Sequence, residues 1–381
     1  MTQFVLSCLI PTFLLSLSLT GLMRLIAPRV GLIDKPAARK VHTTPTALGG
    51  GVGIVLGFLI PMGLALALIN IKAFEPMLQS FLSPDLLEHV DGMRYKTPQM
   101  LLILGSGLII AVMGLIDDLR PLGWKLRFGI QILLSSLIVY NGVNATVFVS
   151  HPVISGVLSV LWLVTLINAF NFLDNMDALT GGIGFIACCI FSVIMLNMTG
   201  EPRWFVAGTL LCLAGAIAGF LVHNWPPAKI FMGDAGSTFI GLMLGTMSIS
   251  GTFYDESMPS RHVILAPLCV LAIPLYDFTT VIIIRLKRGL SPWHPDKNHF
   301  SHRLVELGLS RKYAVMTIHL ATLTTGLAGL LLYSVDTWPP AWTILAIVFC
   351  VMAIITVLER AGRKKFDRQQ REAAAKGISE A

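Results

Sequence analysis

The chain has few charged residues for its length. Only 13% of its 381 residues are Asp, Glu, Lys or Arg, whereas an ordinary soluble domain carries about 25%. This scarcity excludes an ordinary soluble enzyme, an intrinsically disordered chain and a coiled coil. Hydrophobic residues instead make up 55% of the sequence, and the mean hydropathy is +0.76.

Cysteine is also scarce, and its positions carry no metal-site pattern. The six cysteines lie within apolar runs, and none stands at zinc-ligand spacing with a histidine. We interpret them as small apolar residues packed between helices. The net charge of +7 is typical of the cytoplasmic loops of a membrane protein and does not indicate a nucleic-acid partner.

Apolar runs of about 20 residues, the length needed to cross a bilayer core as a helix, recur along the chain. They predict an all-α, polytopic integral membrane protein with about eleven transmembrane helices. The predicted spans are 3–26, 48–70, 98–116, 126–148, 153–170, 179–198, 203–222, 236–252, 262–284, 314–333 and 338–358. A transmembrane β-barrel is excluded, because its strands would alternate apolar and polar residues over about 10 positions.

The positive charges lie mostly on one side of this alternating path. With the N-terminus outside, 23 of the 28 Lys and Arg residues fall in cytoplasmic segments and five fall outside. That bias is typical of cytoplasmic loops and places the C-terminus in the cytoplasm. We predict one transmembrane catalytic domain over residues 1–358 and a charged cytoplasmic tail over residues 359–381.

Acidic residues gather at the cytoplasmic ends of the predicted spans. They are Asp117 and Asp118 after the third span, Asp174 and Asp177 after the fifth, and Asp234 at the start of the eighth. Solvated loop charge would explain one such acid, but five at consecutive cytoplasmic ends favour a shared site. Carboxylates together with an amide such as Asn171 suit a hard divalent cation, and Mg²⁺ is the expected one.

Basic residues and histidines lie in the same cytoplasmic segments. They are Lys40, His42, Lys125, Arg127, Lys297, His299, His302 and Arg303. Carboxylates, a metal ion and positively charged side chains together are what a phosphoryl-transfer site requires. Loop charge that sets membrane orientation explains some of the basic residues, but it does not explain the histidines.

At these residues the sequence resembles the polyprenyl-phosphate N-acetylhexosamine-1-phosphate transferases, over residues 31 to 312. The matching pieces, in family order, are Asp34-Lys-Pro with Arg39-Lys40-Val-His42, the Asp117-Asp118 pair, Asn168-Ala-Phe-Asn171-Phe-Leu-Asp174-Asn-Met-Asp177, Phe231-Met-Gly233-Asp234-Ala-Gly-Ser237, and Pro295-Asp-Lys-Asn-His299-Phe-Ser-His302-Arg303. Each piece alone is a weak signal, but five in order on one membrane face are specific.

The resemblance implies a reaction and its participants. A sugar 1-phosphate would pass from a UDP-N-acetylhexosamine to a polyprenyl phosphate in the surrounding lipid, with release of UMP. The cofactor would be Mg²⁺, with Mn²⁺ as a substitute. The enzyme would lie in the bacterial inner membrane as a multi-pass protein, with its active site facing the cytoplasm, and a homodimer is left open.

The resemblance also implies roles for individual residues. Asn171 and Asp234 match positions that bind the metal ion. Four residues match the catalytic acidic motifs: Asp117, Asp118, Asp174 and Asp177. Seven match substrate-binding positions: Lys40, His42, Lys125, Arg127, His299, His302 and Arg303.

Two subgroups of the family compete for this chain. The opening motif and the eleven spans resemble the branch that uses UDP-GlcNAc, rather than the enzymes that use UDP-MurNAc-pentapeptide. The chain departs from the His-x-His-His loop of that branch, because Ser301 replaces the middle histidine.

An ion-coupled transporter is the rival from another class. Its support is Asp277, an acid within the ninth predicted span, because an acid inside a membrane is a functional candidate. Asp277 could equally hold a neighbouring helix or form an edge of the active site. The motifs, however, lie on one face only, whereas a transporter needs access from both.

Overall fold

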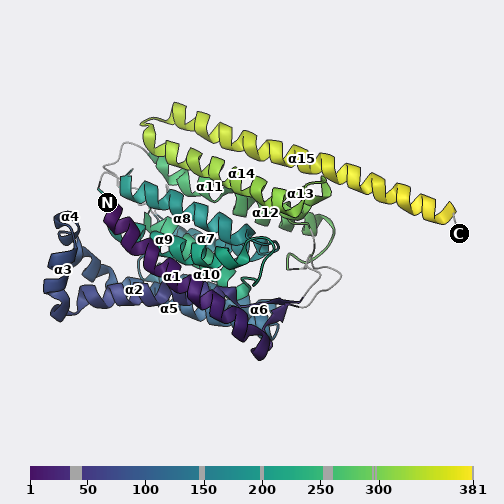
Figure 1. Ribbon diagram of the computed structural model, residues 1–381. Helices are drawn as coiled ribbons and strands as arrows, with labels where there is room; N and C mark the ends of the chain where they lie inside the picture. The colour runs from purple at the N-terminus through teal and green to yellow at the C-terminus, as the bar shows by residue number, and fades with distance from the viewer. Residues whose placement is uncertain are drawn as a thin grey trace.

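The computed structural model is an elongated bundle of helices, from which the C-terminal helix projects at one end (Figure 1). It describes residues 1–34, 45–145, 151–197, 201–251, 261–293, 296 and 298–379, with side chains described up to Arg363. The long helices are α1 (Thr2–Ile26), α2 (Gly50–Asn70), α5 (Val90–Leu119), α6 (Trp124–Tyr140), α7 (Pro152–Leu173), α8 (Leu179–Asn197), α9 (Trp204–Asn224), α10 (Asp234–Gly251), α12 (Ala272–Lys287), α14 (Arg311–Leu331) and α15 (Trp338–Ser379). The short helical elements are η1 (Ala27–Val30), η2 (Lys72–Phe74), α3 (Glu75–Phe81), α4 (Pro84–Leu87), η3 (Arg261–Leu265), α11 (Ala266–Val270), α13 (Phe300–Glu306) and η4 (Leu332–Ser334).

Eight helical segments in the described part of the chain are long and apolar enough to cross a membrane. They contain α1, α2, α5, α7, α8, α9, α14 and α15. A ninth span results if η3 and α11 are joined to α12, across a bend of 66°. The prediction of a polytopic helical membrane protein is therefore confirmed. The remaining two predicted spans coincide with α6 and α10, which have only 17 and 18 residues, so the count of eleven stays a prediction.

Helix α10 forms the buried centre of the bundle. Nearly all its residues are buried, and it packs against α5 and α7. The close approach of α5 depends on Gly114, because a Cβ atom at that position would lie 2.5 Å from the backbone nitrogen of Ala235. The contact brings the C-terminal end of α5 beside the first turn of α10.

A two-stranded sheet joins Asp34, the first residue of the N-terminal motif, to the chain that leads into α2. Strand β1 (Ile33–Asp34) pairs antiparallel with β2 (Thr46–Ala47). The N–H of Phe231 then donates to the carbonyl of Ala47 at 2.9 Å, and the N–H of Gly50 donates to the carbonyl of Phe231 at 2.8 Å. Strand β2 and the start of α2 are thereby fixed beside Phe231, the first residue of the motif that leads into α10.

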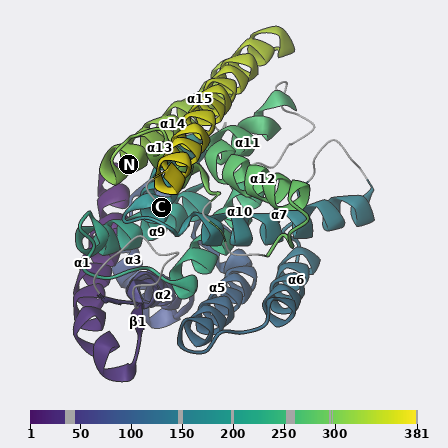
Figure 2. The ribbon, with the colours of Figure 1, turned by 90° about the vertical axis from the view of Figure 1, so that its right-hand side faces the viewer.

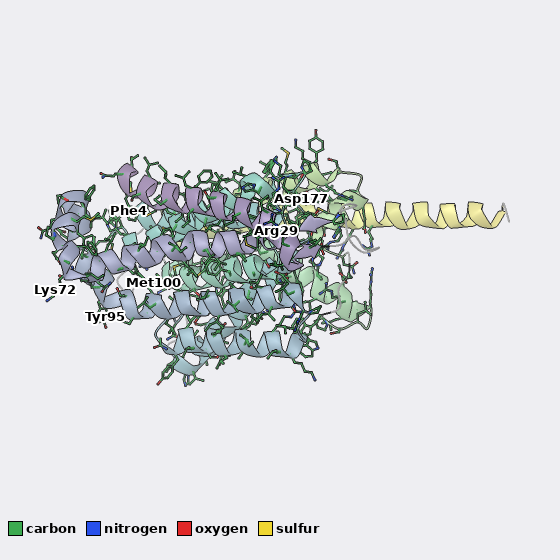
Figure 3. The ribbon with its side chains drawn as sticks, turned by 60° about the horizontal axis from the view of Figure 1, so that its bottom comes forward. Phe4, Arg29, Lys72, Tyr95, Met100 and Asp177 are labelled. Carbon is green, nitrogen blue, oxygen red and sulfur yellow. The ribbon has the colours of Figure 1, made fainter. Side chains whose placement is uncertain are left out.

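The two ends of the bundle carry different loops. Figure 3 shows Lys72 and Tyr95 at one end and Arg29 and Asp177 at the other. Figure 2 views the bundle from the end that carries α13 and the C-terminus. Helix α15 runs without a break from Trp338 into the predicted tail, as far as Ser379. The buried Glu359 accepts a hydrogen bond from Tyr276, so the first residue of that tail packs on the bundle, and the domain division at residue 358 stays a prediction.

Candidate active site

Asp118 joins the end of α5 to the start of α10. Its Oδ1 accepts the backbone N–H of Asp234 at 3.0 Å, and its Oδ2 accepts that of Ala235 at 3.5 Å. The first N–H groups of a helix have no partner within the helix, and a negative charge there is stabilising. Asp118 therefore fixes where Asp234 stands.

Arg127, on the first turn of α6, bridges two of the predicted carboxylates. Its Nη1 lies 2.6 Å from Oδ2 of Asp117 and 3.1 Å from Oδ2 of Asp234. From α7, Asn171 donates through Nδ2 to Oδ1 of Asp234 at 2.9 Å and to Oγ of Ser237 at 3.2 Å. Side chains that are more than 100 residues apart in sequence thus converge from α5, α6, α7 and α10.

A small cavity of about 50 Å³ opens beside this cluster. Arg127, Asn171 and Asp234 line it on one side. Four aromatic rings line it as well, those of Trp124, Phe128, Phe172 and Trp293, together with Met113, Gly114, Gln131, Asn168 and Thr238. The ring of Trp293 lies 5.6 Å from that of Trp124 and 5.5 Å from that of Phe128. The site therefore places charged groups directly against an apolar, aromatic wall.

The two other predicted acids lie just beyond α7. Asp174 follows the last residue of that helix, and burial, together with the charge of Asp234, raises its pKa to about 7. The Oδ2 of Asp177 accepts the backbone N–H of Ala228 at 2.9 Å. Asp177 therefore holds the segment after α9, while Asp174 stands among the carboxylates.

The chemistry of these side chains fits a divalent cation. Carboxylate and amide oxygens are the ligands that Mg²⁺ takes in proteins. The pKa of Asp174 is raised first by burial and then by the negative charge of Asp234, and a bound cation would offset that charge. Among the described residues, no group of three or more His, Cys, Asp and Glu side chains is arranged to hold a metal ion. Both oxygens of Asp234 are instead engaged, by Arg127 and Asn171, and Mg²⁺ stays a prediction.

The predicted basic residues lie in different places. Lys40 and His42 fall outside the described residues. Lys125 is exposed on the first turn of α6, with its Nζ 5.9 Å from the centre of the Trp124 ring. It stands two residues from Arg127, but no hydrogen bond joins it to the carboxylates in the described contacts. Arg127, by contrast, contacts two of the carboxylates directly.

The histidine motif lies at the edge of the cluster. The rings of His299 and His302 are 6.4 Å apart, and His299 meets the Phe172 ring edge-on at 5.9 Å. Arg303 is buried, and its guanidinium contacts Glu359 at 2.9 Å, Thr280 at 2.8 Å and Asp277 at 3.7 Å. Its contact with substrate stays a prediction.

Three contacts of the site were not predicted from the sequence. The sequence leaves three interpretations of Asp277 open, and the structure pairs this residue with His299. The Ser301 hydroxyl donates to Oδ1 of Asn175, which ties the histidine motif to the segment after α7. Trp293 lines the cavity. The sequence gives one indication of this role, because Trp293 stands just before the histidine motif. Its contacts with the other rings cannot be read from sequence spacing.

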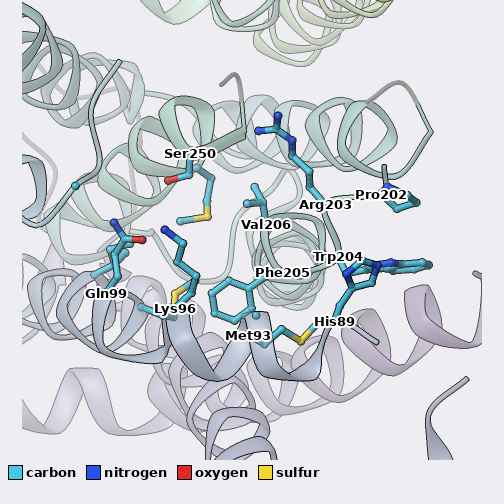
Figure 4. A pocket seen from close by; sticks show the side chains of 15 residues that line it. His89, Met93, Lys96, Gln99, Pro202, Arg203, Trp204, Phe205, Val206 and Ser250 are labelled. Carbon is cyan, nitrogen blue, oxygen red and sulfur yellow. The ribbon is translucent and has the colours of Figure 1, made fainter. Parts of the chain in front are cut away.

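A second cavity, of about 250 Å³, lies at the opposite ends of α5 and α10 (Figure 4). Lys96, Gln99, Arg203 and Ser250 line it, together with apolar side chains, and none of its lining residues is an acid. This cavity is therefore separate from the carboxylate cluster at the other end of these helices.

Comparison with known proteins identifies the class of this membrane protein. The model of the family "Glycosyl transferase family 4" matches residues 100–252, which contain Asp117, Asp118, Asn171, Asp174 and Asp234. The chain belongs to this family of polyprenyl-phosphate N-acetylhexosamine-1-phosphate transferases, and the resemblance found in its motifs is confirmed.

Individual relatives align over nearly the whole chain. The decaprenyl-phosphate N-acetylglucosaminephosphotransferase of Mycolicibacterium smegmatis is 33% identical over 90% of this chain and 86% of its own length. The probable undecaprenyl-phosphate N-acetylglucosaminyl 1-phosphate transferase of Bacillus subtilis is 29% identical over 91% and 90%. The undecaprenyl-phosphate alpha-N-acetylglucosaminyl 1-phosphate transferase of Escherichia coli K12 is 26% identical over 89% and 86%.

Proposed function

We propose that this protein transfers N-acetylglucosamine 1-phosphate from UDP-GlcNAc to a polyprenyl phosphate and releases UMP. The observation that carries the proposal is the convergence of Asp117, Arg127 and Asp234 at one end of the helix bundle. The relatives, whose names give this activity, support it. Those names also favour N-acetylglucosamine over the UDP-MurNAc-pentapeptide that we considered as an alternative donor.

In the proposed reaction an oxygen of the lipid phosphate attacks the phosphorus that carries the sugar. A new P–O bond forms as the bond to the bridging oxygen breaks, and that oxygen leaves with UMP. The second pKa of a phosphate monoester is about 6, so the attacking group is already mostly ionised at neutral pH. The protein therefore has to bring two anions together rather than create a strong base.

We expect that encounter to require a bound cation. A phosphate that approaches Asp117 and Asp234 meets two negative charges and the single guanidinium of Arg127. Bound Mg²⁺ would supply charge neutralisation of the phosphates. Asp117, Asp234 and the amide oxygen of Asn171 are the groups that we expect to hold it, with Arg127 released to a phosphate oxygen.

The lining of the cavity also suits both parts of a polyprenyl phosphate, the charged phosphate and the apolar chain. Arg127 provides positive charge, while Trp124, Phe128 and Trp293 provide an apolar wall on which an isoprenoid chain would pack. We place this end of the bundle at the cytoplasmic face of the bacterial inner membrane, with the N-terminus outside. The Lys and Arg distribution along the sequence supports this orientation.

A transfer assay with purified protein tests the proposal. The protein is mixed with undecaprenyl phosphate and, in turn, UDP-GlcNAc, UDP-GalNAc and UDP-MurNAc-pentapeptide, with MgCl₂, with MnCl₂ or with EDTA. We expect UMP and a lipid-linked sugar from UDP-GlcNAc with either metal and neither product with EDTA. Failure of folded protein to use any donor would refute the enzyme and favour the transporter, and preference for UDP-MurNAc-pentapeptide would refute the proposed donor.

A further inference from the structure

Both carboxylate oxygens of Asp277, on α12, contact the turn that opens α13. Its Oδ2 lies 2.9 Å from Nδ1 of His299, and its Oδ1 accepts the backbone N–H of Phe300. Asp277 is fully buried and His299 is only 7% exposed. Nη2 of Arg303, 3.7 Å from Oδ1, supplies a compensating positive charge.

This pairing determines which nitrogen of His299 is available. A carboxylate accepts hydrogen bonds and does not donate them, so the partner nitrogen Nδ1 carries a proton. The nitrogen left for another partner is Nε2. Asp277 also fixes the orientation of the ring, because it binds both the side chain of His299 and the backbone N–H of the next residue, Phe300.

The oriented histidine stands beside the acidic cluster. Its ring meets the Phe172 ring at 5.9 Å, and Phe172 lines the same cavity as Asp234 and follows Asn171 in the chain. The hydroxyl of Ser301 donates to Asn175 on the same segment. The turn that Asp277 holds is therefore docked against the active site.

Capping α13 does not by itself account for a charged residue at this position. A hydroxyl or amide oxygen would accept the N–H of Phe300 equally well, whereas a buried carboxylate is costly unless it is paired. The charge of Asp277 is matched instead by His299 and Arg303. Such a pair is typical of an acid that orients a working imidazole.

We propose that Asp277 is a positioning residue of the transfer reaction, which directs Nε2 of His299 toward a phosphate oxygen of the UDP-sugar. With a carboxylate on one ring nitrogen and a phosphate on the other, the ring carries both protons, and Nε2–H donates to that oxygen. This inference rests on the proposed function. It assigns Asp277 to the active site and gives it a role that ion transport would not require.

A double-mutant cycle tests whether Asp277 acts through His299. The variants are Asp277→Asn, His299→Gln and the double variant, each assayed for kcat and KM with UDP-GlcNAc after a check of elution profile and thermal midpoint. Loss of the partner that orients an imidazole costs about 10- to 100-fold in comparable sites, and we expect that loss in kcat/KM for Asp277→Asn. The double variant should then match His299→Gln within about twofold.

The control is Tyr276→Phe, which removes a hydrogen bond to Glu359 in the same buried region but leaves His299 untouched, and we expect near wild-type kinetics. If the double variant loses the product of the two single effects, Asp277 does not act through His299 and the inference is overturned. If Asp277→Asn does not fold, Asp277→Ser, which can still cap α13, takes its place in the cycle. A wild-type protein without transfer activity would instead remove the proposed function itself.

Discussion

Replacing Arg127 with leucine should make the protein bind Mg²⁺ more tightly. A single nitrogen of Arg127, Nη1, contacts Asp117 at 2.6 Å and Asp234 at 3.1 Å. A divalent cation at this cluster would compete with Arg127 for the same carboxylate oxygens. Removal of the guanidinium therefore removes a competitor and leaves two carboxylates without their counter-charge.

The size of the effect follows from the two contacts. Opposite unit charges 4 Å apart attract by about 4 kcal/mol at an effective dielectric constant of about 20. The Arg127 side chain is 32% exposed, so solvent screening and the side-chain entropy of Arg127 reduce the competition to about 1.4–2.8 kcal/mol. Each 1.4 kcal/mol is a factor of ten, and the Mg²⁺ dissociation constant should fall about 10- to 100-fold in Arg127→Leu.

Thermal unfolding in increasing MgCl₂ measures this change without reference to activity, because a ligand at free concentration L that binds the folded state stabilises it by RT ln(1 + L/Kd) and so raises the midpoint once its concentration exceeds Kd. Arg120→Leu is the matched control, since it removes an exposed positive charge near the end of α5. The midpoint of Arg127→Leu should begin to rise at a lower Mg²⁺ concentration than that of the control, and it should be shifted further at any given concentration above that. Equal Mg²⁺ dependence in the two variants, or none in Arg127→Leu, would refute the shared cation site.

Three other predictions concern the fold, the acids and the orientation. Gly114→Ala should lower the free energy of unfolding by about 1–3 kcal/mol through overpacking against α10. The control is Gly105→Ala on the same helix, which has open space around it and should leave the free energy of unfolding unchanged. Equal thermal midpoints in the two variants would count against the close contact. The folded-state pKa of Asp174, about 7, lies above its ordinary value of 3.8, so without divalent cations stability should fall as pH rises from about 4 to about 7. Asp174→Asn should make stability depend less on pH in this range. If the thermal midpoints of the variant keep the wild-type pH dependence, the raised pKa of Asp174 is not the cause. In a cysteine-free background, an impermeant thiol reagent should label Asp85→Cys from outside intact cells and Arg288→Cys only in inverted vesicles; labelling of both from one side would refute the orientation.

The class of fold was predictable because one physical requirement dominates it. A chain of bilayer-length apolar runs has to form helices to satisfy its backbone hydrogen bonds, and each predicted span coincides with helix in the described residues. The short α6 and α10 show where this signal weakens. Helix α10 is enclosed by other helices, so its composition reports protein packing rather than contact with lipid.

The acidic cluster was predictable as a group, but its internal contacts were not. Acids at the same ends of alternating helices have to share one end of the bundle, which explains why Asp117 and Asp234 could be grouped. The bridge by Arg127 depends on the approach of α5, α6 and α10, which sequence spacing does not determine. For the same reason the ion pair between Arg303 and Glu359, which lies 56 residues farther along the chain, is visible only in the fold.

The central claim is that the carboxylates around Arg127 form the site where the two phosphate-bearing substrates react. The most direct measurement follows radiolabel from UDP-GlcNAc, labelled in the phosphate next to the sugar, into polyprenyl phosphate. Wild-type protein should produce labelled lipid and an equal amount of UMP, and folded Asp234→Asn should be slower by at least about 100-fold. Transfer by Asp234→Asn at nearly the wild-type rate would contradict the account.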